Sequence, residues 1–205
     1  MKLSILITMY NSCKNTTHIL AKLFEQRQEG VEVIVVDDGS TEDVEIVKEA
    51  CRLFWFRYIH QENQGEAAAR QLSMDEAQGE YFTWIDSDDD ITDDYVQTLL
   101  DETKLGQDMV THYWANKDGT IPDRHPEPLV NWNVWSNMYR KECVKDVKFD
   151  LNRIYASDYF WLEEAVKHCP KLYHSKASVN IYENNNPDSL THRFIRGEIK
   201  EFKNQ

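Results

Sequence analysis

The chain has 205 residues, a length typical of one domain with an extension. Apolar residues make up 41% of it and aromatic residues 12%, which is enough for a sizeable core and excludes a disordered chain. The formal net charge of −13 argues against a protein that grips nucleic acid or an anionic membrane through bulk positive charge.

The first hundred residues alternate between the hydrophobic period of a strand and that of a helix. The run from Val31 to Val36 is nearly all β-branched, as expected of a strand buried on both faces. Repeated strand–helix units predict an α/β fold with a mostly parallel central sheet and helices on both of its faces. Strands are expected at residues 3–9, 31–36, 54–59 and 81–85, and helices at residues 16–28, 64–78 and 93–104, with another helix that Ser40 or Thr41 caps.

The second half has a less regular pattern. Three prolines place a loop at residues 121–130, and the aromatic-rich residues 132–139 are expected to be partly extended. No internal repeat or clear linker divides residues 1–205, so we expect one domain with a smaller mixed part. Strands are expected at residues 108–114, 172–173 and 178–182, a helix at residues 157–168 capped by Ser157, and a final amphipathic piece at residues 194–202.

No segment offers the roughly 18 consecutive apolar residues of a membrane-spanning helix. The polar residues 10–12 interrupt the opening apolar run, and no signal-peptide cleavage site follows them. The four cysteines lie far apart without a CxxC pair, which favours reduced thiols over a zinc or redox site. These features predict a cytoplasmic protein without a transmembrane segment.

Polar side chains follow three of the predicted strands where each strand ends. They are the pair Tyr10–Asn11, the pair Asp37–Asp38 and the acidic run that begins at Asp86. The carboxyl ends of parallel strands share one rim of a sheet, and ligands bind at that rim in open α/β folds. We therefore expect these three groups to meet there.

The acidic run at residues 86–90 has three interpretations. One is a solvated loop. Another is a calcium loop, but Ile91 stands where its turn glycine belongs and Gln97 where its bidentate glutamate belongs. The third is a metal–nucleotide site, in which the Asp86 and Asp88 carboxylates point to one side of an extended segment and attract Mg²⁺ or Mn²⁺.

Four ordered motifs favour the third interpretation, because with them the chain resembles the family 2 glycosyltransferases. They are the opening strand with its Tyr-Asn pair (residues 3–11), VIVVDDGST (33–41), NQGEAAAR (63–70) and GEYFTWIDSDD (79–89). A weaker likeness continues at residues 134–141, around Asp158 and at residues 188–192. The resemblance implies a Rossmann-like A-type glycosyltransferase fold, with a nucleotide-sugar-binding half at residues 1–100 and an acceptor-side half at residues 101–205.

The resemblance also implies a UDP-sugar donor and roles for single side chains. Asp38 is expected to accept a hydrogen bond from uracil N3–H, Tyr10 to stack near the base, and Asp86 to bind the ribose. Asp88 is expected to bind a Mn²⁺ or Mg²⁺ ion that offsets charge on the leaving UDP. Arg70 is expected to neutralise the carboxylates or to face the donor. The remaining expected donor-binding residues are Thr8, Asn11 and Ser87.

Further candidates lie in the second half. Asp158 is the candidate general base, which would take the proton of the acceptor hydroxyl in an inverting transfer; a helix cap is its alternative interpretation. His192 is the candidate third metal ligand, with His174 as the next choice. Three tryptophans are candidates for stacking on a sugar acceptor, although core positions explain them as well: Trp132, Trp135 and Trp161.

The sequence thus predicts a metal-dependent, inverting hexosyltransferase that uses a UDP-sugar. A nucleotide-sugar-binding module without turnover is an alternative. A sugar-1-phosphate nucleotidyltransferase is disfavoured, because residues 8–14 lack the Gly-rich basic loop that it needs. The acceptor is a saccharide, a protein or a modified base in DNA. Two local basic groups, at residues 140–148 and 193–203, permit an anionic acceptor without demonstrating one, and solvated helix faces are the simpler explanation.

Overall fold

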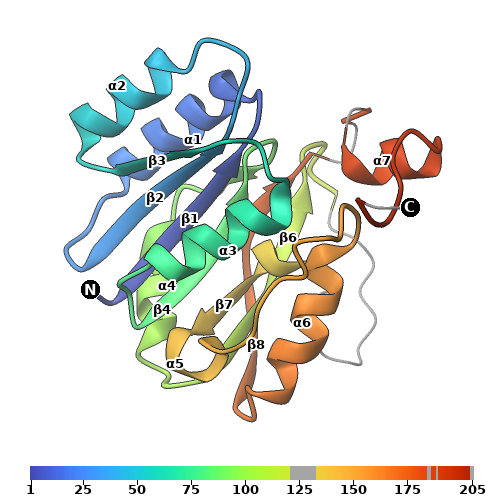
Figure 1. The fold of residues 1–205 in the computed structure, drawn as a ribbon. Coiled ribbons are helices and arrows are strands. Elements are labelled where there is room, and N and C mark those ends of the chain that lie inside the picture. The colour runs from blue at the N-terminus through green and yellow to red at the C-terminus, as the bar shows by residue number, and fades with distance from the viewer. Residues whose placement is uncertain (121–132, 184–185, 188, 204–205) are drawn as a thin grey trace.

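The computed structural model describes residues 1–120, 133–183, 186–187 and 189–203. An eight-stranded sheet crosses this part of the molecule in the order β3-β2-β1-β4-β7-β6-β8-β5 (Figure 1). Strands of the two halves are neighbours at its centre, where β4 pairs with β7, so the chain forms one α/β domain. The strands are β1 (Leu3–Met9), β2 (Val31–Asp38), β3 (Arg57–Gln61), β4 (Tyr81–Asp86), β5 (Asp90–Ile91), β6 (Met109–Asn116), β7 (Asn137–Arg140) and β8 (Leu172–Tyr182).

The sheet is parallel in the first half of the chain and mixed in the second. β1 pairs in parallel with β2 and β4, and β2 pairs in parallel with β3. β7 runs antiparallel to β4 and β6, and β5 runs antiparallel to β8, whereas β6 and β8 are parallel. The predicted mostly parallel sheet with a smaller mixed part is confirmed.

Helices cover both faces of the sheet (Figure 1). Buried residues of α1, α2 and α4 belong to one core, and those of α3 and α6 belong to the core on the opposite face. None of the helices in the described part of the chain is long and apolar enough to cross a membrane. The helices are α1 (Cys13–Glu25), α2 (Glu45–Phe54), α3 (Glu66–Glu76), α4 (Tyr95–Thr103), α5 (Lys141–Val144), α6 (Ser157–Lys167) and α7 (Leu190–Ile195), with a short 3-10 helix at Val134–Ser136.

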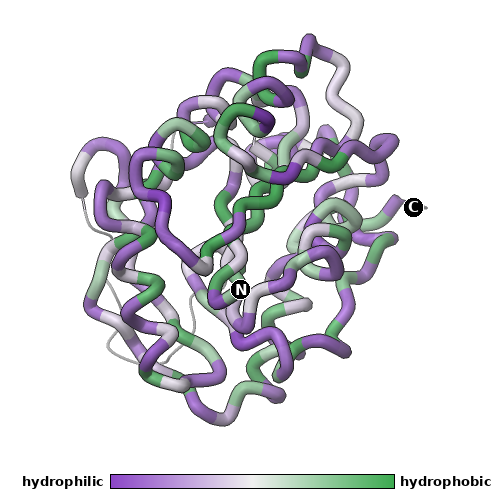
Figure 2. Tube along the Cα trace, turned by 90° about the vertical axis from the view of Figure 1, so that its left-hand side faces the viewer, coloured by the Kyte–Doolittle hydropathy of each residue, from purple (hydrophilic) through white to green (hydrophobic). Residues whose placement is uncertain are grey.

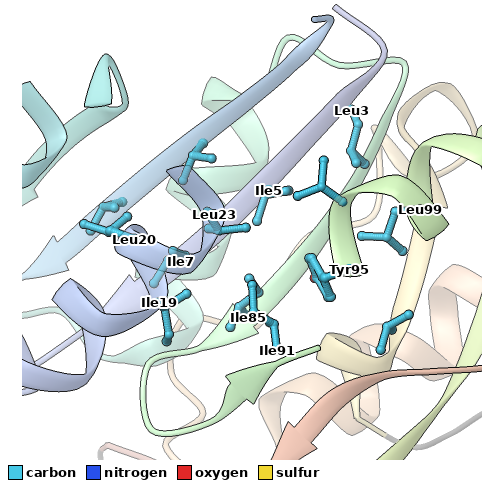
Figure 3. Packing of buried hydrophobic residues seen from close by; sticks show 14 of the residues in the cluster. Leu3, Ile5, Ile7, Ile19, Leu20, Leu23, Ile85, Ile91, Tyr95 and Leu99 are labelled. Atoms are coloured by element: carbon cyan, nitrogen blue, oxygen red, sulfur yellow. The ribbon is translucent and has the colours of Figure 1, made fainter. Parts of the chain in front are cut away.

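The first core explains why the opening strands are apolar throughout. In β1, Ile5 and Ile7 face α1, where they meet Leu20 and Leu23 (Figure 3), whereas Leu6 belongs to the opposite core. Successive side chains of a strand point to opposite faces, so a strand covered on both sides needs apolar residues at every position. Figure 2 shows the result, with hydrophobic strands at the centre and hydrophilic segments outside.

The second core joins the two halves of the chain through aromatic rings. Trp84 of β4 lies at its centre, and its indole N–H donates to Oγ of Ser73 on α3 at 3.0 Å. Trp161 of α6 packs edge-on against Trp84, with ring centroids 5.3 Å apart. Trp161 and Trp135 are 2% and 5% exposed, so the core interpretation of these two is confirmed. Trp132 and the predicted loop at residues 121–130 lie outside the described residues.

The start of α2 differs from the prediction. The helix begins at Glu45, not near Ser40 or Thr41. The backbone N–H of Ser40 donates to Oδ1 of Asp37 at 2.9 Å, and that of Thr41 donates to Oδ1 of Asn11 at 2.8 Å. These bonds hold the two residues in a turn, as the short polar side chains of Asp and Asn commonly do.

Other element boundaries are also corrected. The third strand begins at Arg57 because α2 continues through Phe54. Residues 172–182 form one strand, not two, because register shifts against β6 absorb the polar residues in the middle. α6 begins at Ser157, which therefore does not cap it, and the last helix is Leu190–Ile195, earlier than the predicted piece.

Candidate active site

The carboxyl ends of β1, β2 and β4 lie level at one rim of the sheet. In the strand register, Thr8 of β1 stands beside Val36 of β2 on one side and Asp86 of β4 on the other. Tyr10 follows β1 and is 49% exposed at this rim. The prediction that the three polar groups meet at one rim is confirmed.

Asp38 holds the loop that precedes α3. Its Oδ1 accepts from Nε2 of Gln61 at 2.6 Å and from the backbone N–H of Gln64 at 2.9 Å. Its Oδ2 accepts from the backbone N–H of Gly65 at 2.8 Å. The side chain is thus fixed at the rim by the chain itself, and its predicted contact with uracil stays a prediction.

Gly39 lets two of the sequence motifs pack against each other. Its φ is +72°, and a Cβ at this position would lie 2.5 Å from the backbone nitrogen of Asn63. Glycine meets both requirements because it adopts positive φ readily and has no side chain to clash. The turn after β2 and the loop before α3 therefore form one surface.

Asp37 and Asn11 support this surface from within. Asp37 is fully buried, and although burial opposes its ionisation, hydrogen bonds from Ser40, Tyr58 and His60 lower its pKa. Asn11 has a φ of +51°, and its Oδ1 accepts from the backbone N–H of Thr41. The structure therefore places both side chains within the turn, and a donor contact of Asn11 stays a prediction.

Three carboxylates gather where β4 ends. Asp86, Asp88 and Asp89 each offer an oxygen within 4.8 Å of the others. Burial raises the pKa of Asp86 to about 7 despite the opposing charge of Arg70. Burial and the neighbouring Asp86 carboxylate raise the pKa of Asp89 to about 9. Burial is the largest cause of both shifts, so these carboxyl groups are costly to ionise at this position unless a cation joins them.

These residues fit a hard divalent cation. Asp89 is 5% exposed; its Oδ1 accepts from the backbone N–H of Glu183 at 2.9 Å, whereas its buried Oδ2 has no hydrogen-bond partner among the described residues. Mg²⁺ and Mn²⁺ prefer carboxylate oxygens, so a cation would give the unpartnered oxygen a ligand bond and stabilise the ionised form of these carboxyl groups. Sequence reasoning did not single out Asp89 as a candidate ligand, although it directly follows Asp88 in the acidic run.

Arg70 lies behind the cluster and partly neutralises it. Its side chain is 1% exposed, and it is the only buried arginine or lysine among the residues that the structure describes. Nη2 donates to Oδ1 of Asp86 at 2.8 Å and also to Glu66, and Nη1 lies 4.0 Å from Oδ2 of Asp158. The expectation that Arg70 neutralises carboxylates is confirmed, and its contact with a donor stays a prediction.

The packing of α6 brings Asp158 to the rim. Asp158 stands in the first turn of α6, and the burial of Trp161 holds this helix against β4. Its Oδ1 accepts from the backbone N–H of Tyr159 at 3.0 Å, and its side chain is 27% exposed. The carboxylate is therefore fixed at its helix end and open to solvent beside Arg70.

The two predicted histidines lie apart from the carboxylate cluster. His192 does not belong to the group of Asp86, Asp88 and Asp89. Its Nδ1 lies 2.9 Å from the backbone oxygen of Asn186. The side-chain amide of Asn186 in turn donates to Oδ2 of Asp88 at 2.8 Å. His192 as a ligand stays a prediction. His174 pairs with Thr111 near the amino ends of β8 and β6, away from the rim. Ser87 accepts from Oγ of Ser12 at 2.8 Å.

Comparisons with known proteins agree with this geometry. The model of the glycosyl transferase family 2 matches residues 4–168, and the chain belongs to this family. The glycosyltransferase GlyA of Streptococcus pneumoniae is 38% identical over 156 residues, which cover 70% of this chain and 22% of GlyA. GlyG of the same organism is 33% identical over 123 residues, which cover 57% of this chain and 40% of GlyG. The chain thus spans less than half the length of these relatives.

Solved structures share the fold. Residues 1–349 of TarS from S. aureus align with a TM-score of 0.78 and 22% identity, over 89% of this chain and 60% of that one. Glucosyl-3-phosphoglycerate synthase from Mycobacterium tuberculosis, solved with Mn²⁺ and UDP, aligns with a TM-score of 0.69 and 17% identity, over 93% and 75%. The predicted A-type glycosyltransferase fold is confirmed.

Proposed function

We propose that this chain transfers a sugar from a UDP-sugar to an acceptor hydroxyl with inversion, supported by Mn²⁺ or Mg²⁺. One observation carries the proposal: Arg70 links Asp86, at the end of β4, to Asp158, in the first turn of α6. A candidate donor-binding carboxylate and a candidate base thus lie on either side of the Arg70 guanidinium, at the rim where ligands of such sheets bind. TarS structures with UDP and with UDP-GlcNAc support the choice of donor.

The donor is proposed to lie across the ends of β1, β2 and β4. Asp38 would accept from uracil N3–H with a remaining lone pair, since each carboxylate oxygen has two. Tyr10, half exposed at the same rim, would stack near the base. Asp86 would bind the ribose hydroxyls. Thr8, Asn11 and Ser87 complete the proposed donor surface.

Asp86, Asp88 and Asp89 are the residues that would hold the metal, with His192 as a further candidate. A bound Mg²⁺ or Mn²⁺ would neutralise the diphosphate and the charge that develops on departing UDP. Crystal structures of the synthase from M. tuberculosis with Mn²⁺ and UDP, and with Mg²⁺ and UDP, support this proposal.

Asp158 is proposed to act as the general base. Its carboxylate takes the proton of the acceptor hydroxyl while that oxygen bonds to the anomeric carbon. The bond between the anomeric carbon and the diphosphate oxygen breaks on the opposite face, and its electron pair leaves with UDP. The helix end and Arg70 hold Asp158 in place for this step, and its partial exposure leaves an oxygen accessible to an acceptor.

A donor panel tests the proposal. UDP release is measured for UDP-glucose, UDP-galactose and their N-acetyl forms, with and without Mn²⁺, first in water and then with saccharide, protein and modified-DNA acceptors. Metal-dependent release of UDP from one of these donors supports the proposal. Binding of a UDP-sugar without release would favour the nucleotide-sugar-binding module, and absence of binding to any UDP-sugar would contradict both.

A further inference from the structure

The last described segment of the chain returns to the active-site rim. Residues 196–203, which we call the C-terminal strap, follow α7 and run beside the loop that precedes α6 (Figure 1). The backbone N–H of Ile154 donates to the oxygen of Glu201 at 2.7 Å, and that of Lys203 donates to the oxygen of Asn152 at 2.8 Å. Two segments far apart in sequence are therefore joined as a short antiparallel pair.

Side chains fix the strap in this position. The Arg153 guanidinium lies 3.7 Å from the ring centroid of Phe160 and 4.4 Å from that of Phe202, and it forms an ion pair with Glu201. Cation–π contacts of this kind contribute roughly 0.5–2 kcal/mol each. The strap is thus anchored to α6, the helix that carries Asp158, and its end has a defined place at the rim.

The anchored strap places the Lys203 ammonium against residues 64–65, whose backbone N–H groups donate to Asp38. Nζ of Lys203 donates to the backbone oxygen of Gln64, whose backbone N–H donates to Oδ1 of Asp38. The next residue is Gly65, and a Cβ there would lie 3.7 Å from the same ammonium. A hydrogen-bond donor and a hydrogen-bond acceptor therefore contact the backbone of the same residue, Gln64.

This pair of groups matches the edge of one class of nucleobase. Uracil presents an N–H donor at N3 next to a carbonyl acceptor at O4, and guanine presents the same pattern at N1 and O6. Cytosine presents the reverse, an acceptor at N3 next to an amino donor at N4. A carboxylate acceptor and an ammonium donor that both reach the base edge would bind the first pattern and repel the second.

We propose that Lys203 is a specificity-determining residue that donates to the uracil O4 atom while Asp38 accepts from N3–H. The inference rests on the proposed function, because it takes Asp38 as the acceptor for the base. Lys203 is exposed and its ammonium has three N–H donors, so it can donate to a base carbonyl while its bond to the Gln64 oxygen is kept. The strap thereby makes nucleotide selection depend on a residue 139 positions away from Gln64 in the sequence.

The test compares UDP with CDP, which differ only at this edge. Isothermal titration in the presence of Mn²⁺ gives the two dissociation constants for the wild-type chain and for Lys203→Met. We expect the substitution to weaken UDP binding about tenfold, or about 1.4 kcal/mol, and to leave CDP binding unchanged or stronger. Lys203→Arg should keep most of the preference for UDP. Lys176→Met, which removes an exposed lysine from the middle of β8, controls for the loss of one charge.

The other outcomes separate failure of this inference from failure of the proposed function. If Lys203→Met weakens UDP and CDP equally, the residue acts on the phosphates or merely holds the strap, and the inference is overturned. If Lys203→Met changes neither dissociation constant, the inference is overturned as well. Failure of the wild-type chain to bind UDP at all would instead overturn the proposed function on which the inference rests.

Discussion

Nη1 of Arg70, on α3, lies 4.0 Å from Oδ2 of Asp158, in the first turn of α6. The same guanidinium donates through Nη2 to Asp86 at the end of β4. The buried Arg70 guanidinium therefore sets the spacing between Asp86, in the first half of the chain, and Asp158, in the second. The candidate site depends on this link, because neither carboxylate is held beside the other by direct contact.

Replacing Arg70 should destabilise the fold strongly. Arg70→Met leaves the carboxylates around it without their buried counter-charge, and breaking a buried ion pair in this way costs about 3–5 kcal/mol. Arg52→Ala is the matched control, since Arg52 pairs with Glu49 on the surface of α2, where such pairs contribute about 0.2–1 kcal/mol. Urea unfolding measures both. Similar losses for the two variants would show that Arg70 does not compensate the cluster.

Asp88→Ala should remove the part of UDP affinity that depends on metal. We expect isothermal titration with Mn²⁺ to show UDP binding about 10- to 100-fold weaker than in the wild-type chain, and no difference after metal is chelated. Asp90→Ala is the control, because Asp90 lies outside the cluster and pairs with Lys22 at 3.1 Å. Unchanged UDP affinity in Asp88→Ala would remove Asp88 from the metal site.

Asp89→Asn should weaken metal binding and raise the stability of the metal-free fold. The amide keeps an oxygen that can accept from the N–H of Glu183. It also removes the cost of folding a carboxyl whose pKa is raised to about 9, because that carboxyl must take up a proton at neutral pH that it does not hold in the unfolded chain. In metal-free solution we expect a gain of about 1 kcal/mol, which raises the melting temperature by about 2–4 °C. Added Mn²⁺ should stabilise the wild-type chain and not the variant. A lower melting temperature in the metal-free variant would contradict this account of Asp89.

Gly39→Ala and Gly119→Ala separate backbone strain from steric overlap. Both glycines have positive φ, +72° and +83°, so each alanine is expected to cost about 1–2 kcal/mol from conformation alone. A Cβ at Gly39 also meets the Asn63 backbone, whereas one at Gly119 meets nothing within 4 Å. Gly39→Ala should therefore lose about 1–3 kcal/mol more in urea unfolding. Only Gly39→Ala should also weaken UDP binding; equal effects on stability would refute the close packing of the two motifs.

The rim could be predicted from the sequence because local patterns determine it. The β-branched run at residues 31–36 has to be a buried strand, and strand–helix repetition leaves few arrangements other than a parallel sheet. Polar residues that follow such strands then meet at one edge. The prediction of the rim needed no knowledge of side-chain packing.

Other features depend on contacts between distant parts of the chain. Arg70 stands in an Ala-rich helix, where the sequence pattern equally permits an exposed arginine, and the packing of α6 against β4 is what places Asp158 beside it. Lys203 and Gln64 are 139 residues apart, and no periodicity links them. Element ends were misplaced for a related reason: the turn at Ser40 and Thr41 is held by Asp37 and Asn11 instead of by a helix.

The most direct test of the account is the turnover of Asp158→Asn. The amide keeps the oxygen that accepts from the Tyr159 N–H but does not take a proton at neutral pH, and Glu163→Gln, further along α6 on an exposed position, is its matched control. UDP release from the preferred donor with Mn²⁺ should fall about 10²- to 10⁴-fold in Asp158→Asn, with UDP affinity unchanged and Glu163→Gln like the wild type. Release by Asp158→Asn at a near-wild-type rate would contradict the assignment of Asp158 as the base.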